Sequence, residues 1–167
     1  MTNHLLAAAL GQLEATQSGS PWYGPSRESL LADITASEAA TTLPGGAPSI
    51  WGLVLHMTAW TSEVTRRLDG AAADAPAAGD WPAVPTAATE AAWQRACREL
   101  SRAHAALLRV AAALPGRRWS LVVPRADGAE DGITLADTVI GVAQHDAYHL
   151  GQVALMRRLL RSGPVSG

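Results

Sequence analysis

Apolar side chains recur every three or four positions along four long stretches of the chain, which is the spacing of helices that bury one face. Residues that favour helix starts precede all four stretches, with Thr2 as the predicted cap of the first, and proline- and glycine-rich segments separate them. The second stretch follows Ser49 and stops before Gly70, a suitable residue just beyond a helix end. The pattern predicts four long helices: Thr2 to about Gln17, Ile50 to about Asp69, a third from a cap at Thr86 to the stop at Pro115-Gly116, and a fourth from a cap at Thr134 to about Arg161.

The segments between these helices predict the rest of the architecture. Residues 71–85 are rich in alanine, proline and glycine and lack periodicity, which predicts a long crossover loop. Such a loop lets the helices on either side run in either relative direction. β-prone residues flank the turn dipeptide Asp127-Gly128, so a short β-hairpin is expected before the last helix. A short helix is expected around residues 28–34, followed by a turn near Glu38.

Length and composition support one all-α domain, a four-helix bundle over residues 1–167. The net charge of −2 gives no basic surplus with which to bind nucleic acid or an anionic membrane. Cys97 is the single cysteine, which excludes an internal disulfide and fits a reducing compartment. No apolar run approaches the roughly 20 residues of a membrane span, and the start does not resemble a signal peptide. We therefore expect a cytoplasmic protein.

Two histidines near the end of the chain are the strongest candidates for chemistry. His145 and His149 are four residues apart, so a helix places both imidazoles on one face, about 6 Å apart and within reach of one metal ion. Both fall within the apolar arc of the last helix and therefore point inward. Two inward histidines need polar partners that an apolar core cannot supply. This pattern alone leaves a metal site and a structural histidine pair as equal alternatives.

Two further histidines lie on other helices. His56 is at the edge of the apolar stripe of the second long helix, and by itself it favours a partly buried histidine over a ligand. His104 lies near the inner face of the third helix and is a weaker candidate for binding a metal or ligand, while Cys97 is interpreted as a small buried residue. His56, His145 and His149 would form a three-nitrogen site with open positions, which suggests catalysis. Asp146 follows His145 where zinc proteases have glutamate, so the pattern argues against a protease.

Three motifs stand out along the chain: the run from Ser49 to Trp60 (SIWGLVLHMTAW), the run from His145 to Gln152 (HDAYHLGQ), and Trp22-Tyr23-Gly24-Pro25-Ser26. Together they resemble the DinB/YfiT-like superfamily of four-helix metalloproteins. They occur in the expected order, and the likeness extends over nearly the whole chain. The resemblance implies a bundle that holds a divalent metal, typically nickel or zinc with iron as a further choice, through a histidine triad. Carried over by position, the ligands are His56, His145 and His149.

The resemblance also sets the expected activity. Some relatives are described as transferases or isomerases that use a low-molecular-weight thiol such as bacillithiol or mycothiol, and many have no assigned activity. We expect a metal-dependent enzyme that transfers a thiol to small electrophiles, with a metal-dependent hydrolase as its rival. Gln152 and Glu63 are candidates to orient ligands or substrate, and Trp60 to form a wall of the pocket. The competing class is a non-catalytic bundle that binds metal or dimerises, and a homodimer is expected in either case.

Overall fold

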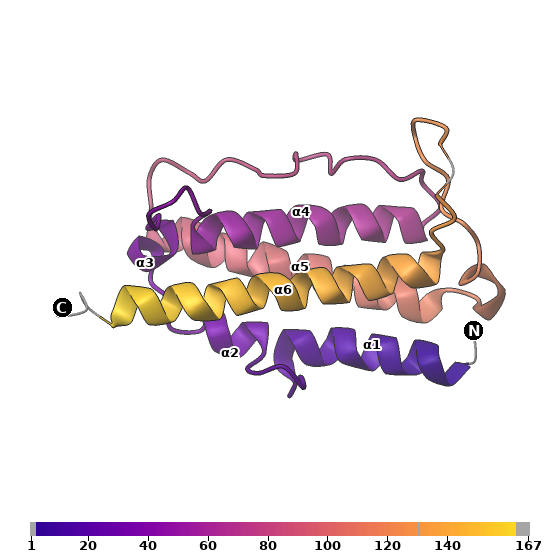
Figure 1. Cartoon of the computed structure of the whole chain (residues 1–167), viewed down its shortest axis with the longest axis horizontal. Helices are drawn as coiled ribbons and strands as arrows, with labels where there is room; N and C mark the ends of the chain where they lie inside the picture. Colours follow the sequence, from indigo (N-terminus) through magenta and orange to yellow (C-terminus); the bar gives the residue numbers. More distant parts are fainter. Residues whose placement is uncertain (1–2, 130, 163–167) are drawn as a thin grey trace.

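The computed structural model describes residues 3–129 and 131–162, and it is helical. Four long helices lie side by side as a bundle: α1 (Asn3–Ser18), α4 (Ile50–Leu68), α5 (Glu90–Ala113) and α6 (Leu135–Arg161) (Figure 1). Three short elements complete the chain: α2 (Arg27–Leu31), α3 (Ala36–Ala40) and the 3₁₀ helix η1 (Gly116–Arg118). The all-α four-helix bundle predicted from the sequence is confirmed. None of the helices in the described residues is long and apolar enough to cross a membrane.

The crossover loop between α4 and α5 determines how the helices run. It returns along the length of the bundle, so that α4 and α5 run in the same direction while α1 and α6 run in the opposite one (Figure 1). Trp51 and Trp93, both near the starts of their helices, have ring centroids 5.3 Å apart, as this parallel arrangement requires. Helix α4 packs against both α5 and α6. Side chains of α4 and α6 therefore face each other across one side of the bundle.

Capping residues set most helix boundaries where the sequence predicts them. The Ser49 hydroxyl accepts a hydrogen bond from the Gly52 N–H at the start of α4, and Gly70 has a φ of +103° just beyond its end. At the start of α6, Thr134 and Asp137 form a reciprocal capping box. The predicted cap at Thr2 lies outside the described residues.

Helix α5 begins later than predicted. Its cap is Thr89 and not Thr86, because the Thr89 hydroxyl accepts a hydrogen bond from the Ala92 N–H. Residues 86–88 are exposed, so a helical turn there would bury no apolar surface. The first fully buried side chain of α5 is that of Trp93, which donates its indole N–H to the Ile34 carbonyl at 2.7 Å.

The hairpin expected before α6 is reduced to a loop. In the described residues, this segment pairs with itself only through an isolated antiparallel bridge, between Val122 and Thr134. Pro124 has no N–H to donate to a ladder, and Gly128 adopts a φ of +75°. The loop instead forms a second, parallel bridge from Arg125 to Ala73, which joins it to the crossover loop.

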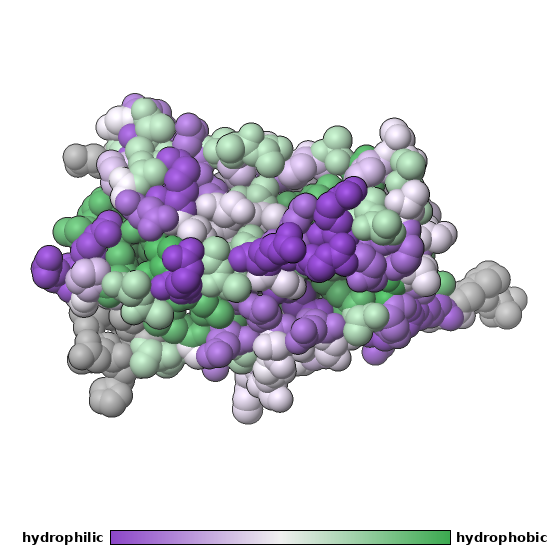
Figure 2. Space-filling view, turned by 180° about the vertical axis from the view of Figure 1, so that it is seen from behind, coloured by the Kyte–Doolittle hydropathy of each residue, from purple (hydrophilic) through white to green (hydrophobic). Residues whose placement is uncertain are grey.

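The apolar core consists of two clusters with polar side chains between them. One cluster surrounds Trp51 and Trp93, and the other surrounds Leu68 and Leu107 toward the opposite end of the bundle. A group of buried polar residues lies in the middle of the bundle: Arg27, His56, His104, Asp146 and His149. Figure 2 shows the surface on the side opposite to that of Figure 1. Hydrophilic residues cover the middle of this face, and its largest apolar area lies toward the N-terminal end of the bundle.

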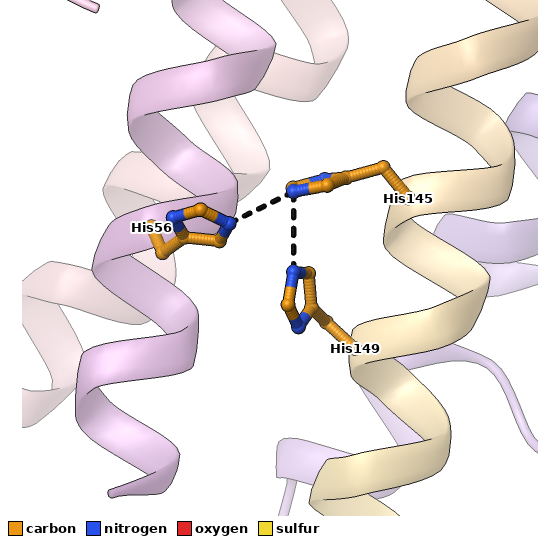
Figure 3. A group of neighbouring side chains, drawn as sticks. All are labelled: His56, His145 and His149. Carbon is orange, nitrogen blue, oxygen red and sulfur yellow. Dashed lines mark hydrogen bonds between the residues drawn. The ribbon is translucent and has the colours of Figure 1, made fainter. Parts of the chain in front are cut away.

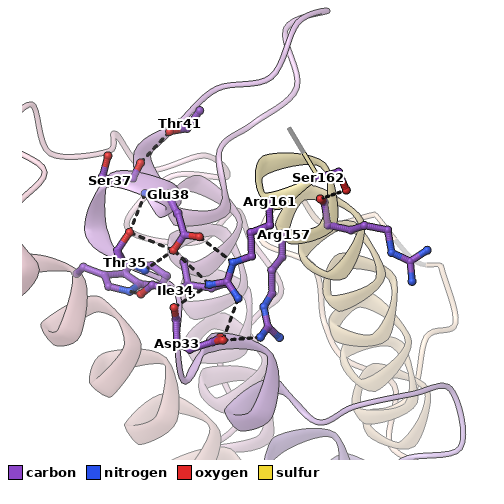
Figure 4. A network of polar contacts seen from close by, with 11 residues as sticks. Asp33, Ile34, Thr35, Ser37, Glu38, Thr41, Arg157, Arg161 and Ser162 are labelled. Carbon is purple, nitrogen blue, oxygen red and sulfur yellow. Dashed lines mark hydrogen bonds and ion pairs between the residues drawn. The ribbon is translucent and has the colours of Figure 1, made fainter. Parts of the chain in front are cut away.

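Arginines in the last turns of α6 attach this helix to the α2–α3 segment. Arg157 and Arg161 both bind the Asp33 carboxylate, at 2.6 and 2.9 Å, and Arg161 also binds Glu38 at 2.8 Å (Figure 4). The hydrogen bond from Arg161 is the main reason that the pKa of Glu38 falls to about 2. These contacts add to the favourable position of the arginines at the negative end of the helix dipole.

Candidate metal centre

Three histidines from two facing helices meet in the middle of the bundle. Helix α4 supplies His56 and helix α6 supplies His145 and His149, and their rings point toward one another (Figure 3). The Nε2 atom of His145 lies 2.9 Å from that of His56 and 3.1 Å from that of His149. One possible ligand atom from each residue lies within 4.8 Å of the others. The structure thus brings together the three histidines selected from the sequence, as a group that could hold a metal ion.

Hydrogen bonds on the far side of two rings determine which nitrogens carry protons. His56 Nδ1 is 2.6 Å from the Asp80 carbonyl oxygen, which can only accept, so the proton of a neutral ring is on Nδ1. His149 Nδ1 likewise donates to Gln152 Oε1 at 2.7 Å. The Nε2 atoms of both rings are then unprotonated, and their lone pairs face the centre of the group.

This donor set fits a divalent cation. Converging lone pairs repel one another unless a positive charge lies between them. Ligand nitrogens 2.0–2.1 Å from a tetrahedral zinc are about 3.3 Å apart, and the observed Nε2 separations of 2.9 and 3.1 Å are within a few tenths of an ångström of that value. Burial, and secondarily the neighbouring histidines, hold the pKa of His149 below its ordinary value. The neutral ring that a metal requires is therefore favoured.

The crossover loop covers one side of the histidine group. Trp81 stacks on the His56 ring, with centroids 3.9 Å apart and planes 9° from parallel. The Trp60 indole N–H donates to Asp80 Oδ1 at 2.7 Å, which holds the loop in place. Asp80 and Trp81 were not selected from the sequence. The available signal was a bulky aromatic and an acidic residue side by side in a loop otherwise composed mostly of alanine, glycine and proline.

The three residues proposed to support the site lie in different places. Gln152 contacts His149 directly, and the Trp60 ring centroid is 6.5 Å from that of His56 and 6.3 Å from that of His145. Glu63 is buried farther along α4 and forms no contact with the histidines among the described residues. Its carboxylate accepts hydrogen bonds from Arg66, Arg67 and the Asp74 N–H, so it anchors the start of the crossover loop.

A groove leads away from His145 between α4 and α6. Its cavity is about 300 Å³, and the walls are mainly apolar, with Trp60 and Val64 on one side and Val142 on the other. It continues into a second cavity of about 500 Å³ between the crossover loop and the loop before α6, and both cavities share Trp60 and Arg67. A small molecule in this groove would have one end beside the histidine group.

The other candidates from the sequence do not join the group. His104 is fully buried, its Nε2–H donates to the Leu13 carbonyl at 2.9 Å, and its Nδ1 is 3.2 Å from a guanidinium nitrogen of Arg27. Burial lowers the pKa of His104, which keeps the ring neutral. Cys97 is partly buried and packs against the core, less deeply than the sequence predicted. Burial raises the pKa of its thiol to about 11, so the thiol stays protonated near neutral pH.

Fold and site together define a helical bundle with a histidine group able to hold a metal ion. The family model of the DinB superfamily matches residues 27–153, more than half of the chain and including all three histidines. The chain therefore belongs to the DinB superfamily, and the resemblance recognised from its motifs is confirmed. Searches of curated proteins and of solved structures found no match.

Proposed function

We propose that this protein is a metal-dependent enzyme that transfers a low-molecular-weight thiol to small electrophiles. His56, His145 and His149 hold the divalent metal, for which nickel, zinc and iron are the candidates. The observation that carries the proposal is the convergence of three Nε2 atoms beside an open, mainly apolar groove. A bound divalent cation with a free position acts as a Lewis acid and favours loss of the proton from a thiol or a water molecule.

The open side of the group supports catalysis over a purely structural role. Structural metal sites are closed by protein ligands, whereas catalytic sites keep a position free. The side chain of His145 is 26% exposed and lines the groove, while His56 is covered by Trp81 and buried. Trp81 therefore excludes water from one side, and a substrate has access from the other.

The positions of nearby carboxylates favour a thiol over water as the nucleophile. Asp80 and Asp146 face the Nδ1 sides of His56 and His145, away from the converging Nε2 atoms. Asp137, which lines the groove, is engaged by Thr134 in the capping box. None of these three carboxylates is placed to act as a general base for hydrolysis. A thiol, with a pKa of about 8.5, loses its proton far more readily than water and has less need of such a base.

The proposed reaction joins a thiol sulfur to an electrophilic carbon. The S–H bond breaks as the S–C bond forms, and the proton passes to the leaving group or, in an addition, to the adduct. Trp60, Val64 and Val142 bind the apolar part of the electrophile and orient its reactive carbon toward the histidine group. No redox partner is needed for this step.

The test begins with the metal content of purified protein. Wild type should hold about one equivalent of nickel, zinc or iron, and a His145→Ala/His149→Ala variant should hold none. Gln144→Ala is the matched control, because Gln144 is exposed and adjacent to His145 in α6. Wild-type protein that takes up no metal even after reconstitution would refute the proposal.

Activity then separates the alternatives. Cobalt-substituted protein should change its visible spectrum on addition of N-acetylcysteine and should accelerate the reaction of this thiol with 1-chloro-2,4-dinitrobenzene. Hydrolysis of p-nitrophenyl acetate without any effect of the thiol would favour the metal-dependent hydrolase. Metal binding with neither activity would favour the non-catalytic bundle, for which chelation should remove much of the fold's stability.

A further inference from the structure

A second group of buried polar side chains lies on the interior side of α6, behind the metal centre. Asp146 is 1% exposed, and its α-helical position is about 100° around the helix from His145. Its carboxylate therefore points into the bundle and not toward the groove. Arg27 from α2 and His104 from α5 are buried in the same region, at 2% and 0% exposure.

Distances connect this group to the metal centre through His145. One carboxylate oxygen of Asp146 is 3.7 Å from His145 Nδ1, and the other is 3.8 Å from His104 Nδ1. His104 Nδ1 in turn is 3.2 Å from Arg27 Nη1. A continuous line of polar atoms thus runs from the metal centre across α6 to the far side of the bundle.

His104 cannot be the hydrogen-bond donor for Asp146. Its Nε2–H is donated to the Leu13 carbonyl, and its Nδ1 accepts from Arg27, so the neutral ring has no second proton to offer. Among the described residues, both Asp146 oxygens, His145 Nδ1 and Arg27 Nη2 are buried without a hydrogen-bond partner. Buried polar groups of this kind are normally paired, and the nearest of these donors to the carboxylate is His145 Nδ1.

We propose that Asp146 is a positioning residue for the metal centre: its carboxylate accepts the Nδ1–H of His145 and thereby presents the unprotonated Nε2 to the metal. The Arg27 guanidinium, buried in the same region, supplies a compensating positive charge. Each of the three histidines then has its own acceptor, the Asp80 carbonyl for His56, Gln152 for His149 and Asp146 for His145. This inference rests on the proposed metal-binding function.

A purely structural role for Asp146 makes a different prediction. If the carboxylate served only to neutralise Arg27, its removal would harm the protein by leaving a buried positive charge. Removing both charges together would then restore metal affinity. If Asp146 positions His145, the double variant should still bind metal weakly, since the acceptor for Nδ1–H is still altered.

The experiment measures cobalt and zinc affinity by competition with a chromophoric chelator in the full-length protein. The variants are Asp146→Asn, Arg27→Met/Asp146→Asn, and Asp33→Asn as a control that removes a carboxylate bound to the last turns of the same helix without touching a histidine or the groove. We expect Asp146→Asn to weaken metal binding by about 10- to 100-fold, the double variant to remain equally weak, and Asp33→Asn to bind like wild type. Long-range ¹H–¹⁵N spectra of metal-free protein should show His145 protonated on Nδ1 in wild type and shifted toward the Nε2 tautomer in Asp146→Asn.

Two results would overturn the inference. One is Asp146→Asn affinity within about twofold of wild type with an unchanged His145 tautomer, and the other is full recovery of affinity in the double variant. If Asp146→Asn does not fold, the double variant, which has no uncompensated buried charge, provides the same comparison. Failure of the proposed function is distinguishable, because wild type itself would then bind no metal.

Discussion

Replacing Glu63 by glutamine distinguishes a loop anchor from a residue that supports the metal centre. The Glu63 carboxylate, which is 3% exposed, accepts hydrogen bonds from Arg66, Arg67 and the Asp74 N–H. Glutamine has nearly the same shape but has no charge, and one of its two terminal groups donates. We therefore expect Glu63→Gln to destabilise the fold while leaving metal affinity within about threefold of wild type.

The magnitude follows from these contacts. A hydrogen bond to a charged group contributes about 1.5–3 kcal/mol and a neutral one about 0.5–1.5 kcal/mol, so each of the three arginine contacts loses about 1 kcal/mol. Arg66 is 45% exposed, and solvent weakens its share. The expected loss is about 2 kcal/mol in the free energy of unfolding, or roughly 4–8 °C in Tm for a chain of this length.

Urea denaturation followed by circular dichroism, with and without a chelator, measures this loss. The matched control is Glu14→Gln on the exposed side of α1, which should change stability by less than about 0.5 kcal/mol. A Glu63→Gln variant as stable as that control would refute the role in anchoring the loop. Normal stability combined with lost metal affinity would instead return Glu63 to the metal centre.

Three further predictions concern other parts of the molecule. Gln152→Ala removes the acceptor for His149 Nδ1 and should weaken metal binding by about 10- to 100-fold, measured by chelator competition. The pKa of Glu38 is about 2 when folded and 4.5 ordinarily, so its contribution to stability is present above about pH 4.5 and is lost as the pH falls toward 2. Arg161→Gln should flatten this dependence of Tm on pH. The expected homodimer should separate into monomers in Leu155→Glu, since Leu155 is 58% exposed on α6, as measured by sedimentation velocity.

Each of these predictions has a contrary outcome. Wild-type metal affinity in Gln152→Ala would show that the His149 tautomer does not depend on this contact. An unchanged pH profile in Arg161→Gln would mean that Glu38 is stabilised by other groups, with Thr35 the first to examine. Wild-type protein that sediments as a monomer would contradict the homodimer.

The features that the sequence determined are those that depend on neighbours a few residues away. Helix periodicity, the Ser49 cap and the Thr134–Asp137 capping box are local, and they were predicted correctly. The pairing of His145 with His149 is also local, because one helical turn brings the two rings together. The predicted start of α5 was wrong, because residues 86–88 are exposed and a helical turn there would bury no apolar surface. The predicted hairpin was also wrong, because Pro124 has no N–H to donate to a strand ladder and only an isolated bridge forms within that segment.

Contacts between distant segments were decided only by the tertiary structure. Nothing local to His56 determines that it faces α6, and the position of Asp80 and Trp81 over the site depends on the course of the crossover loop. Asp146 had been considered only for its position after His145, yet the packing of α2 and α5 against α6 places it between His145 and His104, with Arg27 beyond. A helical pattern specifies which side of a helix is buried, but the partner that buries it is selected by packing of the whole chain, because that packing must fill the core and pair its polar groups at the same time.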